Sequence, residues 1–200
     1  MGCDIHLYVE MRNKESEKWE SLDHKKYDKY FDDYFVDHVY DDRDYKVFSI
    51  LANVRNYDNI EPISDPRGVP FDTCELIRKE YDTYYDYDMH SASYVTLKEL
   101  NDYKQSHSKI KNYGMITPKQ YEDLQNGILP TSWCRWTTDE TYVEAEWELP
   151  LASTSLDSLI DTLEKLALKH VQYTFTSEED KQEKIKSYAD DVRIVFWFDN

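Results

Sequence analysis

Residues 192–198 constrain the fold more than any other stretch of the sequence. They read VRIVFWF, a nearly continuous apolar run that is rich in β-branched and aromatic side chains. Such a run is typical of a strand that is buried on both faces. A buried strand needs a neighbouring strand on each side and packed layers above and below it. We therefore expect this run in the centre of a sheet.

The opening residues, MGCDIHLYVE, predict a second strand with two unlike faces. Apolar side chains occupy the odd positions, and the opposite face carries Asp4, His6 and Glu10. Alternation with a period of two indicates a half-buried strand. Residues 18–22 follow a polar turn and are expected to return as the hairpin partner. If the strands from both ends of the chain share one sheet, Asp4 and His6 lie near Asp199.

Helix signals occur between these two terminal runs. Apolar spacing predicts helices over residues 44–55 and 156–167. Capping residues predict three more helices, which are expected to begin at Thr96 with Glu99, at Thr117 before Pro118, and at Thr176 with Glu179. The helix that begins at Thr96 is expected to end before Gly114. Residues 141–149 alternate in polarity, which predicts a further strand.

Two segments lack a regular period. Residues 61–72 contain three prolines and a glycine, which predicts an irregular loop. Residues 23–44 are dense in tyrosine and aspartate, and we expect an irregular or partly helical surface insertion there. Together these patterns predict a single α+β domain over residues 1–200. Its central, mostly antiparallel sheet is expected to include the N- and C-terminal strands and to pack against four to five helices.

The chain of 200 residues carries a formal net charge of −17. Binding to nucleic acids and anionic membranes depends on cationic groups, so this charge argues against direct contact with either. The three cysteines match no zinc-site spacing and are odd in number for a disulfide framework. No apolar run approaches the length of a membrane-spanning helix. We therefore expect a cytosolic protein with reduced thiols and no cofactor.

The polar face of the opening strand offers one candidate catalytic group. His6 has Asp4 two residues before it and Glu10 four residues after it, so all three side chains project in the same direction. A histidine with carboxylate support suits a general base. The alternative is a solvated strand face that is polar for no chemical reason.

Residues 88–93, DMHSAS, offer a second candidate. Here His90 is the possible acid or base, and Asp88 and Ser91 are the expected ligand contacts, just ahead of a helix N-terminus that favours an anion. The alternative is a set of local turn hydrogen bonds. Convergence of His6 and His90 would suit a hydrolase. No metal-ligand spacing such as HExxH is present, so we predict no metal site.

The loop sequence DPRGVP offers a third candidate for a functional group. The Arg67 guanidinium and the Gly68 amide suit recognition of a phosphate or carboxylate by a stiff loop. The alternative is an internal ion pair between Arg67 and one of the many acidic residues. If the loop lies beside His6 and His90, these groups together form a polar pocket for an anionic small molecule.

Tyrosine and aspartate are interleaved in residues 27–45 and again in residues 81–87. Carboxylates at a density like that of DNA phosphates, mixed with rigid aromatic rings, suit a surface that occupies a nucleic-acid-binding cleft on another protein. The residues predicted to contact such a partner are Asp32, Asp33, Tyr34, Asp41 and Asp42. The alternative is a solvated surface that keeps the protein soluble.

Five segments resemble a family of proteins encoded by bacteriophages and prophages. They are MGCDIH at 1–6, RDYKVFSILANVR at 43–55, PRGVP at 66–70, DMHSASYVTLKEL at 88–100 and VFWFDN at 195–200. Tyr94 stands where the resemblance leads us to expect tryptophan, and the insertion at residues 27–42 is particular to this chain. The resemblance implies a phage origin and no particular activity.

Two functions lead at this point, and a structural or virion-associated role is a third possibility. The first is a phage-encoded accessory protein in the cytoplasm of the bacterial host, which inhibits a host defence system by binding a host protein with a basic nucleic-acid cleft. The second is an enzyme or sponge for a nucleotide-like molecule, in which Arg67 holds phosphate and His6 or His90 acts as acid or base. The P-loop, GxGxxG and GxSxG patterns are absent, so the standard classes that carry them lose support.

Overall fold

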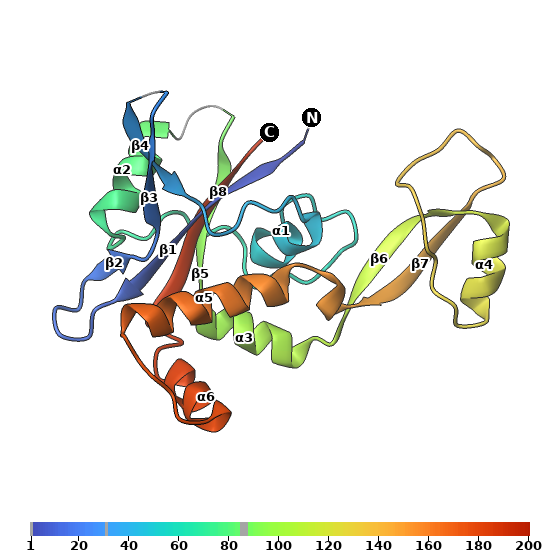
Figure 1. Cartoon of the computed structure of the whole chain (residues 1–200). Helices are drawn as coiled ribbons and strands as arrows, with labels where there is room; N and C mark the ends of the chain where they lie inside the picture. Colours follow the sequence, from blue (N-terminus) through green and yellow to red (C-terminus); the bar gives the residue numbers. More distant parts are fainter. Residues whose placement is uncertain (1, 31, 85–87) are drawn as a thin grey trace.

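The strands from the two ends of the chain lie side by side in the central sheet, as the sequence predicts (Figure 1). The computed structural model describes residues 2–30, 32–84 and 88–200. β1 (Asp4–Arg12) pairs antiparallel with β8 (Val192–Asp199). β2 (Trp19–Ser21) extends the sheet beside β1, and β5 (His90–Thr96) extends it beside β8. The N-terminal hairpin and the central place of β8 are thereby confirmed.

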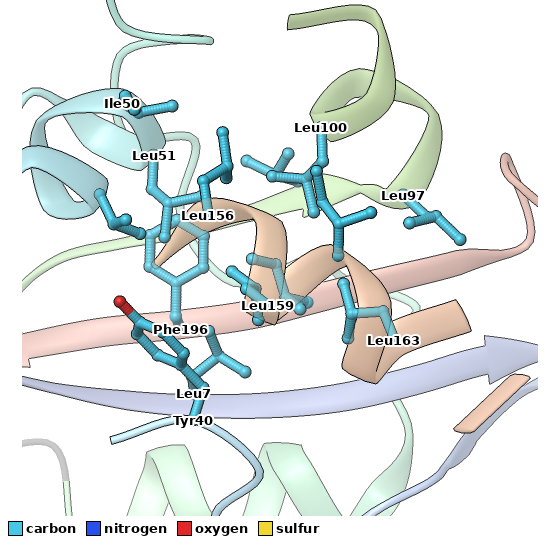
Figure 2. Packing of buried hydrophobic residues seen from close by; sticks show 14 of the residues in the cluster. Leu7, Tyr40, Ile50, Leu51, Leu97, Leu100, Leu156, Leu159, Leu163 and Phe196 are labelled. Atoms are coloured by element: carbon cyan, nitrogen blue, oxygen red, sulfur yellow. The ribbon is translucent and has the colours of Figure 1, made fainter. Parts of the chain in front are cut away.

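The larger hydrophobic core lies on one face of this sheet. It is covered by α1 (Tyr45–Ala52), α3 (Leu97–Ser106) and α5 (Leu156–His170). Figure 2 shows leucines of these helices packed over Leu7 and Phe196 of the sheet. Burial of each such side chain is worth about 1.5–3 kcal/mol relative to exposure. This face therefore supplies most of the apolar burial that holds the sheet in place.

The smaller core lies on the opposite face of the sheet. Trp197 of β8 points into it, because adjacent residues of a strand project to opposite faces, and it packs there with Val36 and Ile77. Ile77 belongs to α2 (Glu75–Tyr84), a helix that the sequence patterns did not reveal. Its apolar stripe is narrow and merges into the second tyrosine and aspartate run, of which residues 85–87 lie outside the described part of the chain.

Helix boundaries follow the capping residues closely. Asp44 accepts hydrogen bonds from the backbone N–H groups at the start of α1, and Thr96 and Thr117 form the two predicted capping boxes of α3 and of α4 (Pro118–Gln125). The last helix, α6 (Glu178–Lys186), begins one residue later than predicted. Ser177 is its N-cap, because Thr176 instead donates to the Asp180 carboxylate.

A two-stranded arm, residues 109–150, projects away from the central sheet (Figure 1). It consists of β6 (Lys109–Ile116), α4 and β7 (Val143–Pro150), and the single turn η1 (Leu151–Ser153) leads from it to α5. The strand predicted at 141–149 is confirmed. The helix predicted to run to just before Gly114 ends instead at Ser106, because residues 109–116 alternate between exposed and buried and so favour a strand.

The insertion at residues 23–44 is a β-hairpin rather than an irregular or partly helical segment. β3 (His24–Asp28) pairs with β4 (Asp33–Asp37), and we call residues 24–37 the finger. Its second strand, DYFVD, has the aromatic and β-branched residues that favour strands. Asp32 lies in the turn with a positive φ of 53°, a conformation that aspartate tolerates better than most residues.

Candidate functional site

The polar face of β1 divides into two halves with different surroundings. At one end, Glu10 is fully buried and accepts hydrogen bonds from Arg193 Nε at 2.6 Å and from the Cys74 backbone at 2.9 Å. Arg193 also donates to Asp72 at 2.9 Å and stacks on the ring of Trp19. This network fastens the loop before α2 onto the sheet. Glu10 is thus committed to Arg193 and does not support His6.

At the other end of β1, the predicted neighbourhood of Asp4, His6 and Asp199 is confirmed. His6 Nε2 lies 3.1 Å from Asp199 Oδ2, and the Asp4 backbone donates to Asp199 Oδ1 at 3.2 Å. Arg43 Nε donates to the Asp4 carboxylate at 2.6 Å. The His6 and Asp199 side chains are 29% and 32% exposed. A half-exposed imidazole oriented by a carboxylate is able to exchange protons with a ligand.

The rings around His6 form an aromatic cluster. His6 stacks on Trp197 with a centroid distance of 6.2 Å, and its edge meets His38 at 6.1 Å. His38 Nδ1 lies 3.1 Å from the Leu7 carbonyl oxygen. Only a protonated nitrogen can share a hydrogen with a carbonyl, so this contact assigns the proton to Nδ1. Tyr8 packs against both His38 and Trp197. The cluster holds the His6 ring between aromatic neighbours.

The predicted convergence of His6 and His90 is wrong. His6 pairs with Trp197 across the sheet, whereas His90 pairs with Phe198 and stacks on its ring at 5.9 Å. Trp197 and Phe198 are adjacent in β8 and project to opposite faces, so the two histidines lie on opposite sides of the sheet. They cannot act on the same ligand atom.

Arg67 and Gly68 both form contacts that dock their loop onto the domain. Arg67 Nη2 donates to Glu99 Oε1 at 2.7 Å, and its guanidinium lies 5.3 Å from the centroid of the Tyr94 ring. The Gly68 amide donates to the Ala92 carbonyl oxygen at 2.8 Å. Gly68 adopts a φ of +78°, which glycine reaches without a steric penalty. The internal ion pair that the sequence offered as the alternative for Arg67 is therefore present in the structure.

A polar pocket of about 410 Å³ lies where β8 ends and β5 begins. Three predicted residues, Asp88, His90 and Ser91, line it together with two residues that the sequence patterns did not single out, Arg55 and Asn200. Asn53 and Val54 complete the lining. We call this the sheet-end pocket. It falls in the 300–1,000 Å³ range of small-molecule sites.

The finger exposes aromatic rings on both of its faces and at its tip. The large exposed side chains there are Tyr27, Tyr30, Tyr34 and Phe35, of which Tyr30 is 84% and Tyr34 is 64% exposed. Tyr27 and Tyr34 oppose each other across the strand pair, with ring centroids 5.2 Å apart. Among the finger side chains that the structure describes, only Val36, near the base, is buried in the smaller core. The predicted partner contact Tyr34 is therefore accessible.

The predicted carboxylates of the insertion fall into separate places. Asp32 lies in the finger turn, where it accepts a hydrogen bond from Tyr27. Asp33 begins β4, and its side chain lies outside the described part of the structure. Asp41 and Asp42 are exposed, but they follow Tyr40, which is buried in the larger core. They are thus tethered near α1 rather than carried by the finger.

Sequence reasoning also missed an apolar surface on the arm. Trp136 is 76% exposed there, and Ile128, Leu129, Trp133 and Tyr121 are exposed to a lesser degree. The root of the arm is fixed by buried Asp58, which accepts hydrogen bonds from Arg135 and Lys46. The run ILPTSWCRW, with its apolar residues beside proline and serine, was the available signal for this surface.

No family model, curated protein or solved structure matches the chain in the three comparisons made. Among the described residues, no group of three or more histidine, cysteine, aspartate or glutamate side chains is arranged to hold a metal ion. None of the helices described is both long and apolar enough to cross a bilayer. The function is therefore inferred from the geometry of the finger and of the sheet-end pocket.

Proposed function

We propose that the protein binds a basic partner protein through the finger and inhibits it. The observation that carries this proposal is the exposure of aromatic rings on both faces and at the tip of a hairpin. A two-stranded hairpin is at best marginally stable alone in water, and exposed rings add little to the stability of the fold. Rings held out in this way suit insertion into a cleft of another protein.

The tyrosines of the finger suit a protein interface, and the net charge of the whole chain favours a cationic cleft. Tyrosines are frequent hot spots of protein interfaces, since they bury a large area at low entropic cost. The net charge of −17 attracts a basic surface over several ångströms and repels nucleic acid. Exposed Asp41 and Asp42 add carboxylates beyond the finger. A nucleic-acid-binding cleft offers the complementary charge.

The biological setting of the proposal rests on the family resemblance of five segments, which implies a phage origin. A phage-encoded acidic protein that blocks a nucleic-acid cleft would inhibit a defence system in the cytoplasm of the bacterial host. The resemblance supplies the setting and the finger supplies the mechanism, so the two parts are tested separately.

The test is capture of a partner from host extract by the tagged protein, followed by competition with double-stranded DNA. We expect DNA to release the captured protein, because both would occupy the same cleft, and we expect capture to weaken as salt increases. The double variant Tyr30→Ala/Tyr34→Ala should reduce affinity at least about tenfold, as loss of interface hot spots does.

The matched control is Trp136→Ala, which removes an equally exposed ring from the arm. Unchanged capture by this variant would assign the interface to the finger. Neutralising Asp32, Asp41 and Asp42 as asparagines should lower the salt dependence of capture. If the finger variants retain full capture while Trp136→Ala or His90→Ala abolishes it, the proposed surface is wrong.

A further inference from the structure

Arg55 differs from most arginines of the chain in its partners. Each of the following pairs with a carboxylate at hydrogen-bond distance: Arg12, Arg43, Arg67, Arg135 and Arg193. Arg55 instead donates to Asn200 Oδ1 at 2.7 Å and to the Tyr57 hydroxyl at 3.3 Å, both neutral groups. In the described part of the chain, no carboxylate forms an ion pair with it.

The hydrogen-bond partners described for Arg55 include no carboxylate, although Asp88 also lines the pocket. The neighbouring Cys3 is fully buried, and this burial raises the pKa of its thiol despite the opposing effect of Arg55. The thiol therefore stays neutral near pH 7. Of the seven arginines, Arg55 and Arg78 form no described ion pair; Arg78 donates to the Pro70 carbonyl oxygen, whereas Arg55 lines the sheet-end pocket. The guanidinium fork of N–H donors is suited to a phosphate or carboxylate.

Two further features of the sheet-end pocket are typical of a binding site. His90 Nδ1 lies 2.9 Å from Ser91 Oγ, whereas His90 Nε2 is buried and has no hydrogen-bond partner among the described residues. Ser91 adopts a φ of +52° at a β-bulge between His90 and Ser93, and Arg55 adopts a φ of +51°. Bulges and backbone strain of this kind are concentrated at functional sites.

We propose that the sheet-end pocket binds a small organic phosphate of the nucleoside monophosphate class, with its phosphate on Arg55. Asp88 also lines the pocket, and a carboxylate is able to accept hydrogen bonds from sugar hydroxyls. The same carboxylate and the negative net charge of the chain disfavour ligands with additional phosphates. The pocket volume of about 410 Å³ accommodates a ligand of this size.

This site is independent of the finger. It is built by the turn after α1, the start of β5 and the residue after β8, whereas the finger packs on the smaller core of the opposite face. Binding of a small phosphate and binding of a partner protein are therefore separate properties. Failure of one proposal leaves the other intact, since Arg55 takes no part in the finger.

The test is isothermal titration calorimetry of the full chain with adenosine 5′-monophosphate, adenosine, adenosine 5′-triphosphate and glutamate. We expect the monophosphate to bind and adenosine to bind at least about tenfold more weakly, because a charge-assisted pair with Arg55 is lost. The triphosphate should also bind more weakly than the monophosphate. Binding of glutamate without binding of the monophosphate would overturn the ligand class.

The matched variants are Arg55→Gln and Arg67→Gln. The first should weaken monophosphate binding at least about tenfold, whereas the second, which breaks the ion pair with Glu99 outside the pocket, should not. Equal weakening by both, or no wild-type binding at about 1 mM ligand, overturns the proposal. If Arg55→Gln does not fold, NMR titration of the wild type with the monophosphate decides whether the pocket is the site. The backbone amide chemical shifts of Arg55, His90 and Ser91 must then change.

Discussion

The finger and the sheet-end pocket are both polar and aromatic, but the fold holds them in opposite ways. In the finger, the contacts of Tyr27 are local, with Tyr34 and with Asp32. In the pocket, His90 rests on Phe198, which is fully buried in the larger core. Groups fixed by a core are pre-organised for a small ligand, whereas exposed rings gain their burial only when a large partner arrives. The two regions therefore suit two different kinds of binding.

The largest expected difference is in the free energy of unfolding, between a variant of the core beneath the pocket and a variant of the finger tip. Phe198→Ala should lower the free energy of unfolding by about 3–5 kcal/mol, because it opens a cavity among Phe48, Phe196 and His90. Tyr30→Ala at the finger tip should change it by less than about 0.5 kcal/mol. Urea denaturation of both variants measures this. A destabilisation by Tyr30→Ala comparable to that of Phe198→Ala would mean that the finger is part of the core.

The next comparison is between the free-energy costs of breaking a buried ion pair in the sheet and an exposed ion pair on the finger. Glu10→Gln should cost about 3 kcal/mol, because it leaves the buried Arg193 guanidinium without its closest carboxylate. Asp37→Asn breaks the pair with Lys26 on the finger, where both side chains are largely exposed, and should cost less than about 1 kcal/mol. The same urea titrations apply. Equal costs would mean that the Lys26 and Asp37 pair is buried rather than exposed on the finger.

The root of the finger provides a test by pH. Burial raises the pKa of Asp23 to about 7, against its hydrogen bonds from Val9 and Ser21. The folded state then keeps a proton that the unfolded state releases near its usual pKa of 3.8, so this group lowers stability as pH rises from 4 to 7.

Asp23→Asn removes that titration. The stability of Asp23→Asn relative to the wild type should therefore increase by on the order of 3 kcal/mol between pH 4 and pH 7. Denaturation at a series of pH values measures the difference. A difference that stays constant with pH would show that Asp23 is solvated, with the finger root open to water.

Local sequence patterns predicted the strands and helices whose formation depends on a single segment of the chain. The alternation in β1, the apolar run of β8 and the capping boxes at Thr96 and Thr117 each fixed an element, and strand pairing then brought His6 to Asp199. The separation of His6 from His90 was not accessible in this way. It depends on the register of β5 against β8 and on a bulge after His90, neither of which leaves a local pattern.

The role of Arg55 was hidden for a related reason. Its place in the pocket depends on the left-handed turn that follows α1 and on its contact with Asn200, which is 145 residues away in sequence. Arg67, in contrast, had a suggestive proline and glycine context but finds Glu99 as a partner. Whether an arginine is available for a ligand depends on whether a carboxylate forms an ion pair with it, and this is a property of the tertiary fold.

The smallest expected effect tests the separation of the two sheet faces directly. His6→Ala removes the contact with Asp199. Because both side chains are partly exposed, the free energy of unfolding should fall by less than about 1 kcal/mol. Adenosine monophosphate binding should not change, because His6 lies across the sheet from the pocket lining. Calorimetry on His6→Ala and His90→Ala compares the faces. Weaker binding is expected only for His90→Ala, and a loss in both variants would mean that one ligand reaches both histidines around the end of β8.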